Sequence, residues 1–138
     1  MGKKTKITVI IIGTLLAVLI VGLTIFVSVD LNVAPRFVIE DGVLKVLDTY
    51  AKSISLEGAE ITLLDKVPKL GQRIAGTSLR DLKKGRYTLS TGEEVYLSLV
   101  RADMQCIMID NGKKYFINCG EKSETLALYY ELTNVFKR

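Results

Sequence analysis

A run of basic residues carries the side chains of this sequence that are best suited to bind an anion. Seven lysines and arginines lie between positions 66 and 86 with one acidic residue, Asp81, so this stretch has a net charge of +6. Clustered cations attract phosphate and carboxylate groups. The alternative interpretation is a solvated loop rim that only keeps the domain soluble. The candidate binding residues are Lys69, Arg73, Arg80, Lys83, Lys84 and Arg86.

Groups for catalysis or metal binding are scarce. The chain has no histidine, which is the commonest general base and metal ligand, and its two cysteines are too few for a zinc site. Residues 71–78 have the glycine spacing of a phosphate-binding P-loop, but Thr77 stands where the phosphate-binding lysine is required. We therefore expect no enzymatic activity, no metal and no cofactor.

The two cysteines, Cys106 and Cys119, flank a predicted hairpin that turns at residues 110–112. A two-residue turn at Asn111-Gly112 places both cysteines on one face, whereas a three-residue loop through Asp110 places them on opposite faces. A disulfide therefore depends on the register. Two buried cysteines that act as small apolar residues are the favoured interpretation.

Residues 7–29 contain no charge and no proline, and three lysines precede them. As a helix this segment spans roughly 34 Å, enough to cross the hydrocarbon core of a bilayer. The apolar region of a signal peptide is shorter, about 7–15 residues. We predict a cytoplasmic basic stub (1–6), a transmembrane helix (7–29) and a linker (30–35). By the positive-inside rule, the rest of the chain lies outside the cell membrane.

Residues 36–138 are predicted to form one extracytoplasmic domain that is mainly β. Asp41-Gly42 joins two strands at 37–40 and 43–47, and Ser90-Thr91-Gly92 joins two more at 86–89 and 94–99. The second register places five residues on one apolar face: Tyr87, Leu89, Val95, Leu97 and Leu99.

Near the C-terminus the apolar period changes to that of a helix. We expect Ser123 to cap this helix, and Lys137 and Arg138 to complement its dipole at the other end. Its predicted apolar stripe consists of Thr125, Leu128, Tyr129, Leu132, Val135 and Phe136.

Residues 64–79 and 83–89, followed by 114–118 and 123–132, resemble the bacterial pleckstrin-homology-like domain family of membrane-anchored proteins. The resemblance implies a barrel of two packed antiparallel sheets that is capped by one helix. It does not imply phosphoinositide binding here, because Lys45 is the only basic residue of the first hairpin.

The sequence thus predicts a membrane-anchored binding or scaffolding module. Its domain at the outer face would engage a protein, an anionic envelope polymer or a lipid head group, and no nucleic acid. The alternative is an accessory or sensory subunit that associates with a membrane complex through its transmembrane helix, in which Gly13 and Ala17 form a small-xxx-small step.

Overall fold

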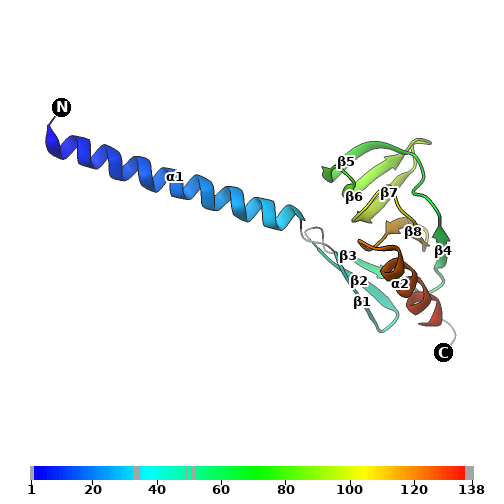
Figure 1. Ribbon diagram of the computed structural model, residues 1–138. Helices are drawn as coiled ribbons and strands as arrows, with labels where there is room; N and C mark the ends of the chain where they lie inside the picture. Colours follow the sequence, from blue (N-terminus) through cyan, green and yellow to red (C-terminus); the bar gives the residue numbers. More distant parts are fainter. Residues whose placement is uncertain (1, 33–34, 49, 51, 136–138) are drawn as a thin grey trace. The chain divides into compact units, whose positions relative to one another are not determined.

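The computed structural model describes residues 2–32, 35–48, 50 and 52–135. Its contacts divide the chain into two compact units, Met1–Val33 and Ala34–Arg138. Within the described residues, the first unit is one helix, and the second has nine strands and one helix (Figure 1).

The first unit is helix α1 (Lys3–Asn32). Within its segment Lys3–Phe26, an 18-residue window has a mean hydropathy of 2.9, and none of this window is buried. A helix that is apolar on all sides is typical of a membrane span. By length and composition, α1 can therefore cross a membrane. It begins and ends beyond the predicted span of 7–29, and residues 30–32 of the predicted linker are helical.

The smaller sheet of the second unit consists of β1 (Arg36–Glu40), β2 (Val43–Leu47) and β3 (Lys52–Ser55) in that order. Asp41 and Gly42 connect the first two strands with φ angles of 52° and 74°, the positive values of a type I′ turn. Glu40 pairs with Val43, so the predicted first hairpin is confirmed.

The larger sheet has the strand order β4-β8-β9-β7-β6-β5. Strand β9 lies between β8 and β7 and runs parallel to β7, whereas the other neighbouring strands are antiparallel. This parallel pair departs from the expectation of two purely antiparallel sheets. The strands are β4 (Glu60–Leu64), β5 (Leu70–Leu79), β6 (Leu82–Leu89), β7 (Glu94–Leu99), β8 (Cys106–Asp110) and β9 (Lys114–Ile117).

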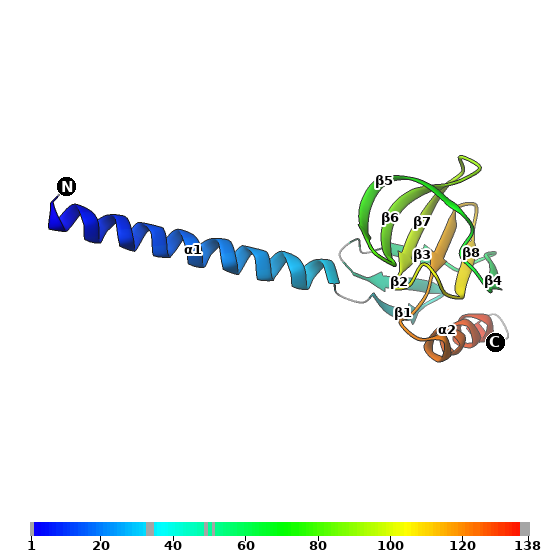
Figure 2. The same cartoon turned by 45° about the horizontal axis from the view of Figure 1, so that its top comes forward.

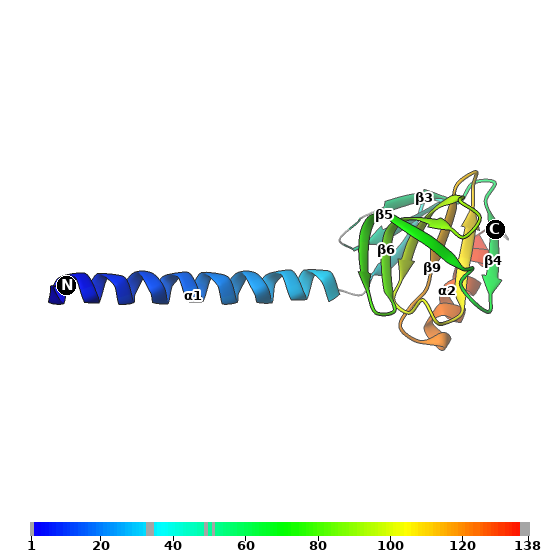
Figure 3. The ribbon, with the colours of Figure 1, turned by 90° about the horizontal axis from the view of Figure 1, so that it is seen from above.

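The six-stranded sheet must curl because its two edge strands, β4 and β5, are consecutive in the chain. In a flat sheet with strands about 4.8 Å apart, the edges would be about 24 Å from each other. The connection through residues 65–69 spans at most about 21 Å. Figures 2 and 3 show the resulting curvature of β5, β6 and β7.

Each face of the curled sheet contributes to a hydrophobic core. The first core lies between this sheet, the three-stranded sheet and the C-terminal helix, and it includes Leu44, Ile54, Ile107, Ile117 and Leu132. The second core lies on the opposite face. It contains the predicted apolar face of Tyr87, Leu89, Val95, Leu97 and Leu99, together with Cys106 and Phe116.

Most of the basic stretch, for which a solvated loop rim was the alternative interpretation, forms the hairpin of β5 and β6. Leu79 pairs with Leu82, so Arg80 and Asp81 make a two-residue turn. Arg80 has a φ of 51° at a position where glycine is usual. The next turn is as predicted, with a three-residue loop in which Gly92 has a φ of 88°.

Helix α2 (Lys122–Asn134) packs against β4 and β8 and buries Thr125, Leu128 and Leu132. The predicted Ser123 cap is wrong, because Glu121 occupies the N-cap position without a side-chain cap. Thr125 instead stabilises the helix start: its Oγ1 accepts a hydrogen bond from the backbone N–H of Cys119 and donates one to the carbonyl of Glu121. The predicted stripe residue Phe136 and the helix-end charges Lys137 and Arg138 lie outside the described residues.

Both cysteines are free thiols. In the last hairpin Asp110 pairs with Lys114, and the three loop residues are therefore 111–113. This register places Cys106 and Cys119 on opposite faces of the sheet. Burial raises the pKa of the Cys106 thiol to about 12, which keeps it protonated.

Candidate functional site

A cleft between the two sheets is the site of the second unit in which polar and aromatic side chains converge. Its floor is set by strand register on the inner face of the six-stranded sheet. Arg86 of β6 pairs with Tyr96 of β7, and Tyr96 pairs with Tyr115 of β9. Because paired residues point to the same face, these three side chains form a row across three strands.

The two tyrosines of this row contact each other. Their ring centroids are 5.3 Å apart and their planes are inclined by 20°, an offset stack. Burial and the neighbouring Tyr96 raise the pKa of Tyr115, so its hydroxyl stays neutral at physiological pH. The pair supplies a flat, rigid and largely apolar floor.

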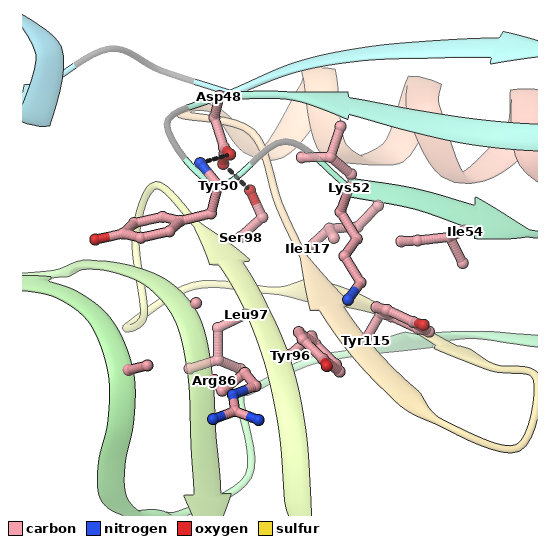
Figure 4. A pocket seen from close by; sticks show the side chains of 13 residues that line it. Asp48, Tyr50, Lys52, Ile54, Arg86, Tyr96, Leu97, Ser98, Tyr115 and Ile117 are labelled. Carbon is pink, nitrogen blue, oxygen red and sulfur yellow. Dashed lines mark hydrogen bonds between the residues drawn. The ribbon is translucent and has the colours of Figure 1, made fainter.

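The opposite wall of the cleft comes from the three-stranded sheet. Lys52 of β3 pairs with Val46 of β2, and both line the cleft with Ile54. The Lys52 ammonium extends across the gap and lies 3.7 Å from the centroid of the Tyr96 ring (Figure 4). This is a cation–π contact between the two sheets.

Polar contacts close one end of the cleft. Asp48 Oδ1 accepts a hydrogen bond from the backbone N–H of Tyr50 at 2.8 Å, and Oδ2 accepts one from the Ser98 hydroxyl at 2.9 Å. The Tyr50 hydroxyl lies 2.7 Å from Thr77 Oγ1. These bonds tie the connection between β2 and β3 to the six-stranded sheet. They also engage both oxygens of the Asp48 carboxylate.

The cleft has a volume of about 430 Å³, within the range of cavities that take small organic ligands. Its charged lining residues are Lys52, Arg86 and Asp48. Arg86 also lies 3.3 Å from Glu94, but both side chains are about half exposed, so this ion pair is weak. The cleft therefore offers two cations that can turn toward a ligand and one carboxylate already engaged by the protein.

The structure does not gather the six predicted basic residues into one site. Arg86 alone lines the cleft. Lys69 and Arg73 are exposed before and along β5, and Arg80 is exposed in the turn. Lys83 is partly buried and bonds to the Ser78 hydroxyl.

Lys84 is not a surface binding residue, because its side chain is only 1% exposed. It pairs with Thr77 and Ser98, which are also buried. The six-stranded sheet is covered on both faces at β6. Because consecutive residues of a strand point to opposite faces, one of Lys83 and Lys84 must point to the inner face of this sheet.

Apart from Arg86, the lining residues of the cleft were not identified as site residues from the sequence, among them Lys52, Tyr96 and Tyr115. One local signal existed. Tyr96 alternates with the apolar residues Val95 and Leu97 and therefore had to lie on the other face of its strand. Its pairing with Tyr115 depends on the parallel contact of β7 and β9, which no local pattern reveals.

In the part of the chain that the structure describes, no group of three or more cysteine or acidic side chains is placed to hold a metal ion. Comparison with protein-family models, with curated proteins and with solved structures found no match. The resemblance to the bacterial pleckstrin-homology-like family stays a prediction.

Proposed function

We propose that this protein is a membrane-anchored binding module whose inter-sheet cleft recognises an anionic group. Helix α1 would hold the protein in the cell membrane as a single span. The lysines at positions 3, 4 and 6 precede the apolar segment and Asp30 follows it, which favours a cytoplasmic N-terminus and an outer unit beyond the membrane. The partner would then be an envelope component or a molecule outside the cell.

The observation that carries this proposal is the convergence of Lys52 and Arg86 on one cavity from two different sheets. Cations held on strands are better positioned than cations on a loop, because hydrogen bonds to neighbouring strands fix their backbones: β6 pairs with β5 and β7, and β3 pairs with β2. An anion between them would gain charge-assisted hydrogen bonds. Confinement at the membrane would strengthen weak binding further through a high effective concentration.

We favour binding over catalysis because of the state of the cleft's acidic residue. Both Asp48 oxygens accept hydrogen bonds from the protein, so this carboxylate is already engaged in holding the connection between β2 and β3. Tyr50, Tyr96 and Tyr115 supply hydroxyls that suit hydrogen bonding to a ligand.

We also propose that the outer unit is pleckstrin-homology-like. Two packed sheets and a C-terminal helix that covers one core support this assignment. The parallel pair of β7 and β9 and the curled six-stranded sheet are its departures from the expected barrel.

The proposal is tested by thermal unfolding of the full chain in nanodiscs of zwitterionic lipid, with inorganic phosphate, pyrophosphate, citrate or benzenesulfonate added. A ligand that binds only the folded state raises the unfolding temperature. We expect at least one anion to do so for the wild type, and the increase to be lost in the K52M/R86Q variant.

The matched control is the K113M/R80Q variant. It removes the same two charges from exposed residues that do not line the cleft. It should respond to the anion as the wild type does. An equal response of both double variants, or no response of the wild type to any of the four anions, would contradict the proposed function.

A further inference from the structure

We infer that the preferred ligand of the cleft is an aromatic anion: a flat ring that carries a carboxylate, sulfonate or phosphate group. This inference rests on the proposed function and names the class of ligand. It is drawn from the aromatic floor and the two flanking cations.

The aromatic floor selects for a ring. Tyr96 and Tyr115 stack with each other, and Figure 4 shows both rings on the floor of the cleft. Tyr115 is 6% exposed and Tyr96 is partly buried, so the two rings are held in place and little conformational entropy is lost when a ligand packs on them. Aromatic groups favour such surfaces through offset or edge-to-face contacts.

The cations lie around the same ring. Tyr96 lies between Arg86 and Tyr115 in the strand register, and the Lys52 ammonium lies over it. A ligand ring that packs against Tyr96 therefore has its substituents within reach of both cations. Lys52 can exchange its contact with the ring for a charge-assisted hydrogen bond to the anion, which is the stronger interaction.

The inference is tested with three probes of similar size and the full chain in zwitterionic nanodiscs. Benzenesulfonate has ring and charge, cyclohexanesulfonate has the charge without an aromatic ring, and benzyl alcohol has the ring without charge. Dissociation constants are measured by ligand-observed NMR, with empty nanodiscs subtracted. We expect benzenesulfonate to bind at least about fivefold more tightly than either of the other probes.

Variants assign this preference to the cleft. Tyr96→Leu should remove the preference for benzenesulfonate over cyclohexanesulfonate while leaving binding of the latter nearly unchanged. Lys52→Met should weaken both sulfonates about tenfold or more and leave benzyl alcohol unaffected. Tyr130→Leu is the matched control, because Tyr130 is 60% exposed on α2 and does not line the cleft.

The outcomes separate the two proposals. Equal binding of the two sulfonates, both weakened by Lys52→Met, would overturn the aromatic preference and leave the proposed function standing. Binding that Lys52→Met does not change, or no sulfonate binding at all, would overturn both. A ring preference that Tyr130→Leu removes and Tyr96→Leu does not would also overturn the inference.

Discussion

Gly76 and Gly85 face each other across β5 and β6, and neither position has room for a side chain. A Cβ atom on Gly85 would lie 2.3 Å from the carbonyl oxygen of Ala75 and 2.7 Å from the Cα atom of Gly76. The φ angle of Gly85 is 105°, which side chains disfavour. The two strands can therefore approach closely at this pair only while both residues are glycines.

We predict that Gly85→Ala lowers the free energy of unfolding by about 2–3 kcal/mol, because strain and overpacking add. Urea unfolding of the detergent-solubilised chain, followed by near-ultraviolet circular dichroism, measures the change. Gly120→Ala is the matched control. Its Cβ would meet only Val100 Cγ1, at 3.8 Å, and should cost less than about 1 kcal/mol. Equal effects of the two substitutions would show that the glycine pair is not tightly packed.

Cys106 makes the free energy of unfolding depend on pH in the alkaline range. Burial raises the pKa of its thiol from 9.0 to about 12, so the folded state holds a proton that the unfolded state releases earlier. The stabilisation is complete below pH 9 and is lost as the pH rises from 9 to 12. We predict a steeper loss of unfolding free energy over this range for the wild type than for Cys106→Ala. Parallel pH profiles of the two proteins would contradict this assignment.

Lys84 shows that the type of a residue does not by itself predict whether its side chain is exposed. A lysine next to another lysine suggests a solvated surface, and the sequence contains no sign that β6 is covered on both faces. The same limit applies to Tyr115, whose place beside Tyr96 comes from a strand contact between distant segments. Arg86 was the one predicted residue that lines the cleft.

At the scale of elements, turn chemistry decided which hairpins were predictable. Asp41-Gly42 and Ser90-Thr91-Gly92 contain glycines with positive φ angles, and both hairpins were predicted with the correct register. The hairpin of β5 and β6 turns at Arg80-Asp81, which has no glycine or asparagine. Its basic composition also suggested a loop. A strained turn of this kind leaves no local signal in the sequence.

One buried side chain adds to the strand pairing that holds β9 between β7 and β8. Asn118 is fully buried and binds the connection between β7 and β8. Its Oδ1 accepts hydrogen bonds from the backbone N–H groups of Val100 and Arg101 at 2.8 and 3.3 Å. Its Nδ2 donates to the carbonyls of Arg101 and Gln105 at 2.7 and 3.3 Å. These contacts link sequence-distant segments, so the strand order was not predictable from local patterns.

We predict that Asn118→Ala lowers the free energy of unfolding by about 2–4 kcal/mol, because it leaves several backbone groups of this connection unsatisfied. Asn111→Ala is the matched control, since Asn111 is exposed, its Nδ2 donates one hydrogen bond to the carbonyl of Ser55, and its Oδ1 accepts one from the backbone N–H of Lys113. It should cost about 1 kcal/mol or less. Urea unfolding of both variants measures the difference. If Asn118→Ala lowers the free energy of unfolding no more than the control does, Asn118 does not have the proposed stabilising role.

At the scale of the whole molecule, the proposed function gives the two units separable roles. Both hydrophobic cores and the cleft consist of residues from the second unit, and α1 contributes to none of them. We predict that replacing residues 7–26 with an unrelated apolar segment of equal length, without Gly13 and Ala17, leaves anion binding by the cleft unchanged. Ligand-observed NMR in nanodiscs measures this. Loss of binding would instead favour the alternative of a subunit that acts through its transmembrane helix.

The most direct test of the central claim places one cysteine in the cleft and another away from it, in a chain with Cys106→Ala and Cys119→Ala. Ala75→Cys reports on the cleft, which Ala75 lines from β5, and Asn134→Cys reports on the exposed end of α2. A membrane-impermeant maleimide is applied to intact cells with and without benzenesulfonate.

For an outward-facing module that binds anions in its cleft, both cysteines should react without lysis. Benzenesulfonate should slow the reaction at position 75 and leave position 134 unaffected. Reaction only after lysis would place the domain in the cytoplasm. Equal rates at position 75 with and without the anion would show that the cleft is not its binding site.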